Sequence, residues 1–282
     1  PADRLLLTQR LAGRDSVDLI SYEQGRLFFN DLDYRPRPVI QSYAAYTPAL
    51  AARNAAHFLG PQRPDFVLFD PAETIDGRLP MMDDGAALLV VLGHYRALGR
   101  DGKYLLLQRR DDAPRPPQLE SLAERELHWG EDVDLTAFRG EVLAFALEVT
   151  PSAAGRLAGL LFQSLPPQIV LDAGDGERRY RLVPGMLATP VLLSPHLRTS
   201  EDLLALGAPP PAAGFGHAVR RLRFEVAPPA PLLAGHEDFG RALYHDTLKL
   251  RLYRVRGLPD AGFTAAYSPD LDPHPDRVRA GP

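Results

Sequence analysis

Short apolar runs alternate with segments of helical spacing through residues 1–110. Apolar runs bounded by polar or turn-forming residues are typical of buried strands. Four such runs are found here, at residues 17–21, 38–43, 65–70 and 104–108. Strands that alternate with helices over short connections favour an α/β layer on a mainly parallel sheet.

The clearest predicted helix covers residues 48–59. Thr47 is a good N-cap, a proline suits the first helical position, and Gly60 follows the end. Two further helices are expected, at residues 23–30 and at residues 84–98, the second with Asp83 or Asp84 as its cap.

From about residue 120 the pattern changes to closely spaced short strands. Residues 142–149 are apolar on both faces, as in a central strand of a sandwich. Residues 173–176 (AGDG) form a hairpin-turn signal, and residues 200–206 suit a short helix. Further strands are expected at residues 157–162, 168–172, 178–183, 187–193, 219–226 and 248–255. This succession predicts a jelly-roll-like β-sandwich.

A polar, proline-rich stretch at residues 111–118 separates the two patterns and reads as a linker. We therefore predict a small, mainly parallel Rossmann-like α/β domain at residues 1–112. A jelly-roll-like β-sandwich follows at residues 113–257, and a proline-rich tail occupies residues 258–282.

The composition narrows the class of protein. Of 282 residues, 45% are hydrophobic and 24% are charged, which excludes wholesale disorder. The net charge of −4 argues against an electrostatic nucleic-acid partner. Without cysteine, the chain has no disulfide, thiolate metal site or cysteine nucleophile. Its longest apolar stretch, residues 85–92, falls well short of the roughly 20 residues of a membrane helix. Because the sequence begins at Pro1, we expect a piece of a longer protein.

Recognisable catalytic and cofactor motifs are missing from the sequence. It contains no Gly-x-Ser-x-Gly, HExxH, Walker A or Gly-x-Gly-x-x-Gly motif, and its eight histidines are scattered. We therefore assign no catalytic residue, no metal ligand and no cofactor. Calcium on the sandwich loops stays open, because loop carboxylates and backbone carbonyls leave no readable motif.

The strongest candidate binding patch follows the second and third predicted strands, which we expect to be parallel neighbours in the sheet. In open α/β sheets, ligands bind at the carboxyl edge of the strands. Tyrosines, an arginine and acids there can hold a polyol or a phosphate. The candidate residues are Tyr43, Tyr46, Asp76, Arg78 and Asp83, with Ser42, Thr74 and Asp84 beside them. In the structural alternative, Asp76 and Gly77 form a turn, Asp84 caps a helix and Arg78 is their ion-pair partner.

A second candidate is Trp129, which lies in the sequence next to Glu131, Asp132 and Asp134. An indole ring can stack on a sugar, and paired carboxylates serve glycosidases. A solvated acidic turn at the edge of the sandwich is the alternative interpretation.

Several segments together resemble a known group of proteins. They are residues 17–21, 34–48 (YRPRPVIQSYAAYTP), Asn54, 64–69, 75–80 and 83–85 in the first half, and 181–186 and 192–195 in the second. They resemble the soluble C-terminal region of large bacterial multi-pass membrane proteins. Those proteins are in turn similar to membrane-embedded glycosyltransferases that use lipid-linked sugars. The resemblance covers most of residues 15–255.

The resemblance implies a periplasmic or extracytoplasmic position at a bacterial inner membrane, beside the membrane portion of the parent protein. In such transferases the catalytic acid lies in the membrane portion, so no catalytic residue is carried over. We expect a non-catalytic domain pair in cell-envelope glycan assembly, acting by recognition or scaffolding, with a glycan or lipid-linked sugar as partner. Two alternatives stay open: a stand-alone glycan-acting enzyme with paired carboxylates, and a purely structural interaction module.

Overall fold

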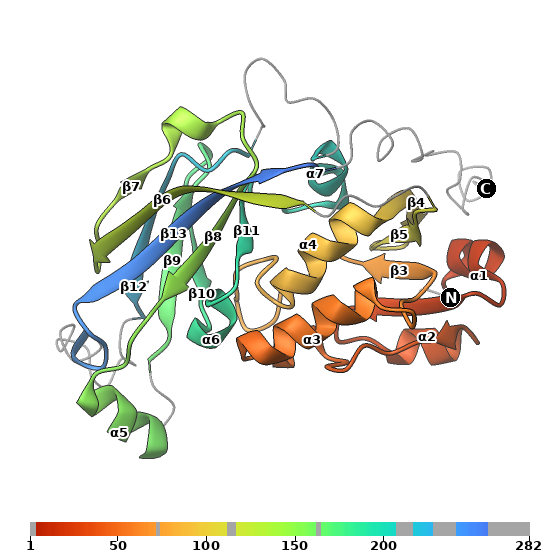
Figure 1. Ribbon diagram of the computed structural model, residues 1–282, viewed down its shortest axis with the longest axis horizontal. Coiled ribbons are helices and arrows are strands. Elements are labelled where there is room, and N and C mark those ends of the chain that lie inside the picture. The colour runs from red at the N-terminus through yellow and green to blue at the C-terminus, as the bar shows by residue number, and fades with distance from the viewer. Residues whose placement is uncertain are drawn as a thin grey trace, which may run out of the picture.

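The computed structural model describes residues 4–71, 74–111, 117–161, 165–206, 217–227 and 241–258. An α/β part formed by the N-terminal residues lies beside a part built from two antiparallel sheets (Figure 1). No helix within these ranges is long and apolar enough to cross a membrane.

The sheet of the α/β part has five strands in the order β2-β1-β3-β5-β4. Its strands are β1 (Ser16–Ile20), β2 (Asp33–Tyr34), β3 (Phe66–Phe69), β4 (Tyr95–Asp101) and β5 (Tyr104–Arg109). β1 pairs in parallel with β2 and β3, whereas β5 runs antiparallel to both β3 and β4. The sheet is therefore mixed, not mainly parallel as predicted. A short turn joins β4 to β5, and such a connection permits only antiparallel pairing.

Helices cover both faces of this sheet. Because side chains alternate along a strand, Val17 and Leu19 pack in one apolar cluster and Ile20 in another. The first cluster includes residues of α1 (Leu6–Ala12) and α2 (Gly25–Phe29). The second includes residues of α3 (Pro48–Leu59) and α4 (Gly85–His94). The prediction for α3 is confirmed, since Thr47 Oγ1 accepts a hydrogen bond from the Leu50 N–H and Gly60 ends the helix.

Two further predictions for the α/β part are wrong. The second strand is not residues 38–43 but the two-residue β2; residues 38–43 form an irregular segment that enters the 3₁₀ turn η1 (Ser42–Ala44). Prolines 36 and 38 cannot donate to a strand ladder, and the Asn54 side chain takes both backbone groups of Val39. The helix expected at residues 84–98 ends at His94, because the next seven residues pair with β5.

The second part consists of two four-stranded antiparallel sheets. One has the order β10-β9-β12-β7 and the other β11-β8-β13-β6. The inner faces pack together, with the rings of Phe145 and Phe224 6.1 Å apart. The strands are β6 (Gln118–His128), β7 (Val133–Asp134), β8 (Leu143–Glu148), β9 (Pro167–Asp172), β10 (Glu177–Arg181), β11 (Val191–Ser194), β12 (Arg221–Val226) and β13 (Thr247–Arg256).

Most predicted strands of this part are confirmed, as is the β9–β10 hairpin, but two elements differ. The expected strand at 157–162 is helix α5 (Ala153–Leu161), whose first turn is closed by Ser152 Oγ accepting from the Gly155 N–H. The long edge strand β6 was not predicted. Its residues are mostly exposed and four of the eleven are charged, so they lack the apolar pattern of a buried strand. The remaining short elements are η2 (Thr136–Phe138), α6 (Pro184–Leu187) and α7 (Ser200–Ala205), the last capped by Thr199.

The two parts share one hydrophobic core cluster. It contains residues of α4 as well as of both antiparallel sheets. A Cβ at Gly85, at the start of α4, would lie 3.4 Å from the Val191 side chain of β11. Of the predicted linker, residues 112–116 lie outside the described residues, and so does the predicted tail from residue 259 onward. The domain boundary stays a prediction, and the shared core leads us to expect cooperative unfolding of both parts.

Candidate functional site

A cleft lies at the carboxyl ends of β1 and β3. From β1 the chain moves to β2 on one side and then returns through α3 to β3 on the other side. Connections therefore leave β1 and β3 in opposite directions, which is where open α/β sheets bind ligands. The cleft is small, with a cavity volume of about 30 Å³. Its lining is Ile20, Ser21, Tyr22, Ser42, Tyr43, Phe69, Asp70, Ile75, Leu79, Met81, Asp83 and Leu88.

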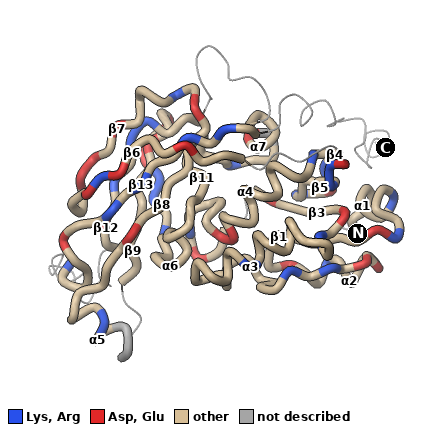
Figure 2. Tube along the Cα trace, viewed as in Figure 1, with Lys and Arg blue, Asp and Glu red and all other residues tan. Residues whose placement is uncertain are grey.

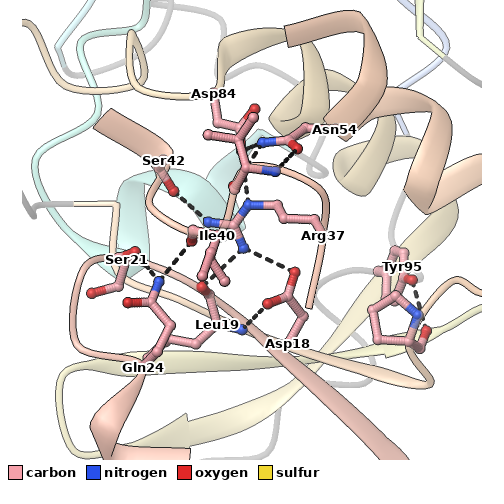
Figure 3. Close-up of polar contacts among 12 residues, drawn as sticks. Asp18, Leu19, Ser21, Gln24, Arg37, Ile40, Ser42, Asn54, Asp84 and Tyr95 are labelled. Atoms are coloured by element: carbon pink, nitrogen blue, oxygen red, sulfur yellow. Dashed lines mark hydrogen bonds and ion pairs between the residues drawn. The ribbon is translucent and has the colours of Figure 1, made fainter. Parts of the chain in front are cut away.

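A buried arginine holds the segment that carries Ser42 and Tyr43 over the cleft. Arg37 is 1% exposed, and its guanidinium lies at the centre of the contacts in Figure 3. One nitrogen, Nη1, donates to Asp18 Oδ2 at 2.9 Å and to the Leu19 carbonyl at 3.0 Å. The other terminal nitrogen donates to Ser42 Oγ at 2.6 Å. Arg37 thus ties the loop after β2 to the end of β1.

The same guanidinium reaches the loop that precedes α4. Arg37 Nε donates to Asp84 Oδ2 at 2.9 Å, and Asn54 Nδ2 on α3 donates to that oxygen at 2.7 Å (Figure 3). Burial of Arg37 opposes its charge, but the attraction of Asp18 and Asp84 outweighs it and raises the Arg37 pKa. Sequence reasoning treated Asp84 as a helix cap. Asp84 does occupy the N-cap position of α4, but its side chain makes no capping hydrogen bond and pairs with Arg37 instead.

Asp84 is held in an unfavourable state. Its φ of 62° lies in the left-handed region, where a non-glycine residue is strained. Burial raises the pKa of Asp84 to about 6, although Arg37 and Asn54 act in the opposite direction. Its Oδ1 atom is buried and accepts no hydrogen bond from the described residues. The contacts of Arg37 therefore stabilise a backbone and a charge that are both costly on their own.

Arg78 connects three of the predicted site residues. Its Nη1 donates to the Tyr43 carbonyl at 3.0 Å and to Asp83 Oδ1 at 3.1 Å, and its Nη2 donates to the Tyr46 hydroxyl at 3.3 Å. Its guanidinium carbon lies 5.9 and 5.6 Å from the ring centroids of Tyr43 and Tyr46. Arg78 is 4% exposed while Tyr46 is 45% exposed. Arg78 thus positions the tyrosines instead of presenting its own charge.

The antiparallel sheets support this wall of the cleft. The Arg181 N–H of β10 donates to the Gly77 carbonyl at 2.7 Å, and the Leu79 N–H donates to the Arg181 carbonyl at 3.2 Å. On α6, a Cβ at Gly185 would collide with the carbonyl oxygen of Tyr46. Glycine is therefore required where the second part contacts the tyrosine segment.

A second polar cluster borders the opposite side. Lys103 Nζ lies 2.8 Å from Glu23 Oε2 and 3.8 Å from Asp70 Oδ2. The Tyr104 hydroxyl also donates to Glu23. Burial opposes the charge of Glu23, but hydrogen bonds from Lys103, Tyr104 and Arg26 lower its pKa to about 2. Lys103 is therefore engaged by carboxylates on the cleft side.

The structure brings together four of the six predicted residues. Tyr43 and Asp83 line the cleft, and Arg78 joins them to Tyr46. Asp76 is exposed on the same loop, 3.6 Å from an Arg181 nitrogen. Trp129 lies apart in the second part: it is 7% exposed, its indole N–H donates to the His245 carbonyl, and its ring packs on Tyr244. Its ring face is therefore not presented to a ligand.

The reason for this convergence differs from the expected one. Tyr43 was predicted to follow a strand adjacent to β3, but β1 lies between β2 and β3. The loop after β2 reaches the cleft because Arg37 anchors it across the end of β1. Asp18 and Arg37 were not among the predicted site residues. The sequence signal for them was the position of each charge: Asp18 lies inside an apolar run and Arg37 inside a proline-rich run.

The described residues contain no group of three or more potential metal-binding side chains. The described lining residues offer carboxylates, hydroxyls and backbone groups for hydrogen bonding, together with tyrosine rings. Comparisons with protein-family models, curated proteins and solved structures found no match to this chain.

Proposed function

We propose that this chain recognises a glycan in the cleft between β1 and β3, without catalysing a reaction on it. The observation that carries the proposal is the convergence of Tyr43, Asp70 and Asp83 on a cleft at the point where strand connections diverge. Sugar rings present apolar C–H faces to aromatic rings and hydroxyls to carboxylates. The cleft offers both kinds of partner.

The setting belongs to the same proposal. On the sequence resemblance, the chain belongs to a bacterial inner-membrane protein of envelope glycan assembly, positioned at the periplasmic face beside the membrane portion of its parent. A glycan, or the sugar portion of a lipid-linked sugar with its phosphate linkage outside the cleft, is then the ligand. We further propose that the first part is Rossmann-like and the second jelly-roll-like. The β2-β1-β3 order supports the first assignment, and the two packed four-stranded sheets support the second.

Binding of the chain to a glycan array, followed by titration of each hit, tests the function. Tyr43→Ala should weaken binding roughly two- to tenfold, because an aromatic contact contributes roughly 0.5–1.5 kcal/mol. This variant keeps the backbone carbonyl that holds Arg78. Tyr253→Ala, at a half-buried tyrosine on β13, is the matched control and should bind normally. No binding to any glycan, or equal losses in both variants, would contradict the proposal.

An activity screen on aryl glycosides addresses the enzymatic alternative. Both Asp70 and Asp83 line the cleft, so a glycosidase would place its paired carboxylates there. We expect no turnover. If Asp83→Asn abolished turnover but kept binding, the function would be glycoside hydrolysis instead of recognition. Turnover abolished instead by Asp132→Asn would place the chemistry near Trp129.

A further inference from the structure

We infer that the cleft discriminates by charge: it accepts an uncharged or amine-bearing sugar and rejects the same sugar when it carries a phosphate or carboxylate. This inference rests on the proposed function and specifies its ligand class. Among the described lining residues there are two carboxylates, Asp70 and Asp83, and no lysine, arginine or histidine. An anionic group entering the cleft would meet charges of its own sign without a cation in the lining.

Arg78 and Lys103, the described cations that pair with the lining residues Asp83 and Asp70, are already engaged. Arg78 has its two terminal nitrogens bonded to Asp83 and the two tyrosine segments, and its side chain is buried between the tyrosine rings. A phosphate at Arg78 would have to displace these bonds and expose the guanidinium. Recognition of phosphate by arginine needs its nitrogens available as a fork, which this geometry does not offer.

Lys103 is engaged on the other side of the cleft. Its ammonium lies between Glu23 and Asp70, at 2.8 and 3.8 Å. Glu23 keeps its charge to low pH, since its hydrogen bonds lower its pKa to about 2. An anionic ligand would therefore compete with two carboxylates for Lys103.

The buried network adds to this bias. Beneath the lining, Arg37 is flanked by Asp18 and Asp84, two carboxylates to one guanidinium. When both are ionised, the layer directly below Ser42 carries one net negative charge. Electrostatic complementarity then favours a ligand with a positive group over one with a negative group.

Matched monosaccharides test the inference with the complete chain. The probes are glucose, galactose and mannose, their 2-amino-2-deoxy forms and their 6-phosphates, titrated by NMR at low salt. We expect each 6-phosphate to bind at least tenfold more weakly than its parent sugar, and each amino sugar to bind at least as tightly. The difference should shrink in about 1 M salt, where screening acts within roughly 3 Å.

Asp70→Asn should bring a 6-phosphate to within about threefold of its parent. The matched control is Asp76→Asn, since Asp76 is an exposed carboxylate on the same loop outside the lining. If Asp70→Asn does not fold, Asp83→Asn and the salt titration of the unsubstituted chain give the same comparison.

A 6-phosphate that binds as tightly as its parent would overturn the inference and leave the proposed function intact. Equal effects of Asp70→Asn and Asp76→Asn would also overturn it, because the discrimination would then arise from the general field of the protein. Absence of binding by every probe and by the glycan array would instead overturn the proposed function itself.

Discussion

Arginine–carboxylate networks occur in both parts of the molecule, but they differ in burial. In the α/β part, the side chains of Arg37, Asp18 and Asp84 are fully buried. On the outer face of β10, β9 and β12, Arg223 is bonded to Glu177 at 2.6 and 2.8 Å, and both side chains are partly exposed. Positive and negative positions are interspersed along these strands (Figure 2).

The two networks therefore stabilise different things. An ion pair at the surface adds little to the free energy of unfolding, because water solvates both ions when they separate. A buried ion-pair network adds little stability compared with apolar side chains in the same place. Removing one of its members, however, leaves an uncompensated charge in the interior. The buried network consequently fixes which segments meet at the cleft, whereas the exposed one mainly covers β9. Val170 of β9, paired with Arg223, is only 2% exposed.

The largest expected effect is that of Arg37→Met. This change leaves the carboxylates of Asp18 and Asp84 buried without their guanidinium, so the free energy of unfolding should fall by about 3–5 kcal/mol in urea denaturation. The triple variant Arg37→Met, Asp18→Asn, Asp84→Asn should recover part of that loss. A loss below about 1 kcal/mol in the single variant, or a triple variant less stable than the single one, would show that the buried charges are not the cause.

The next effect is a pH dependence that arises from Asp84. Its folded pKa of about 6 lies above the unfolded value of 3.8, so its protonated form is favoured in the folded state. The resulting stabilisation is fully present below pH 4 and is lost as the pH rises through 6. The unsubstituted chain should therefore lose about 2–3 kcal/mol relative to Asp84→Asn between pH 4 and pH 7. Parallel stability curves for the two proteins would contradict this.

Arg223→Met repeats the first substitution in the exposed network. Methionine keeps an unbranched apolar chain over Val170. Without the guanidinium, water solvates the Glu177 carboxylate instead. We expect a loss of about 0.5–1 kcal/mol at neutral pH and low salt. A loss comparable to that of Arg37→Met would mean that burial does not separate the two networks.

The smallest expected effect is a difference between the two networks in how their stability losses respond to salt. In about 1 M salt, screening should remove most of the difference between Arg223→Met and the unsubstituted chain, whereas the difference caused by Arg37→Met should persist. Urea denaturation at two salt concentrations measures both. Equal sensitivity to salt would indicate that water reaches the Arg37 network.

Elements with complete local signals could be predicted from the sequence. α3 has its cap, its proline and its terminal glycine, and β3 and β5 are short apolar runs. Elements that form only by pairing with a segment distant in the sequence could not be predicted. β4 has a sequence that also suits the end of α4, and its pairing with β5 decides the outcome. β6 has an exposed, charged sequence, and β13 alone pairs with it among the described strands.

The candidate site divides in the same way. Tyr43, Asp83 and Arg78 were recognisable from residue type and from their position after predicted strands, because the carboxyl edge of a sheet is a general place for ligands. The contacts that these three residues make could not be predicted from the sequence. Arg78 was expected either to bind a ligand or to pair with Asp76 and Asp84. In the structure it is buried, pairs with Asp83 and lies against the rings of two tyrosines.

The sequence by itself determined the alternation of strands and helices, the change to β-strands after residue 120, and the residue types near the cleft. These follow from local periodicity and turn chemistry, which act over a few residues. The tertiary structure alone decided that Arg37 meets Asp18 and Asp84, which are 19 and 47 positions away in the chain. The physical reason is solvation: a charged side chain is stable in water at any position, and only its burial requires one particular partner.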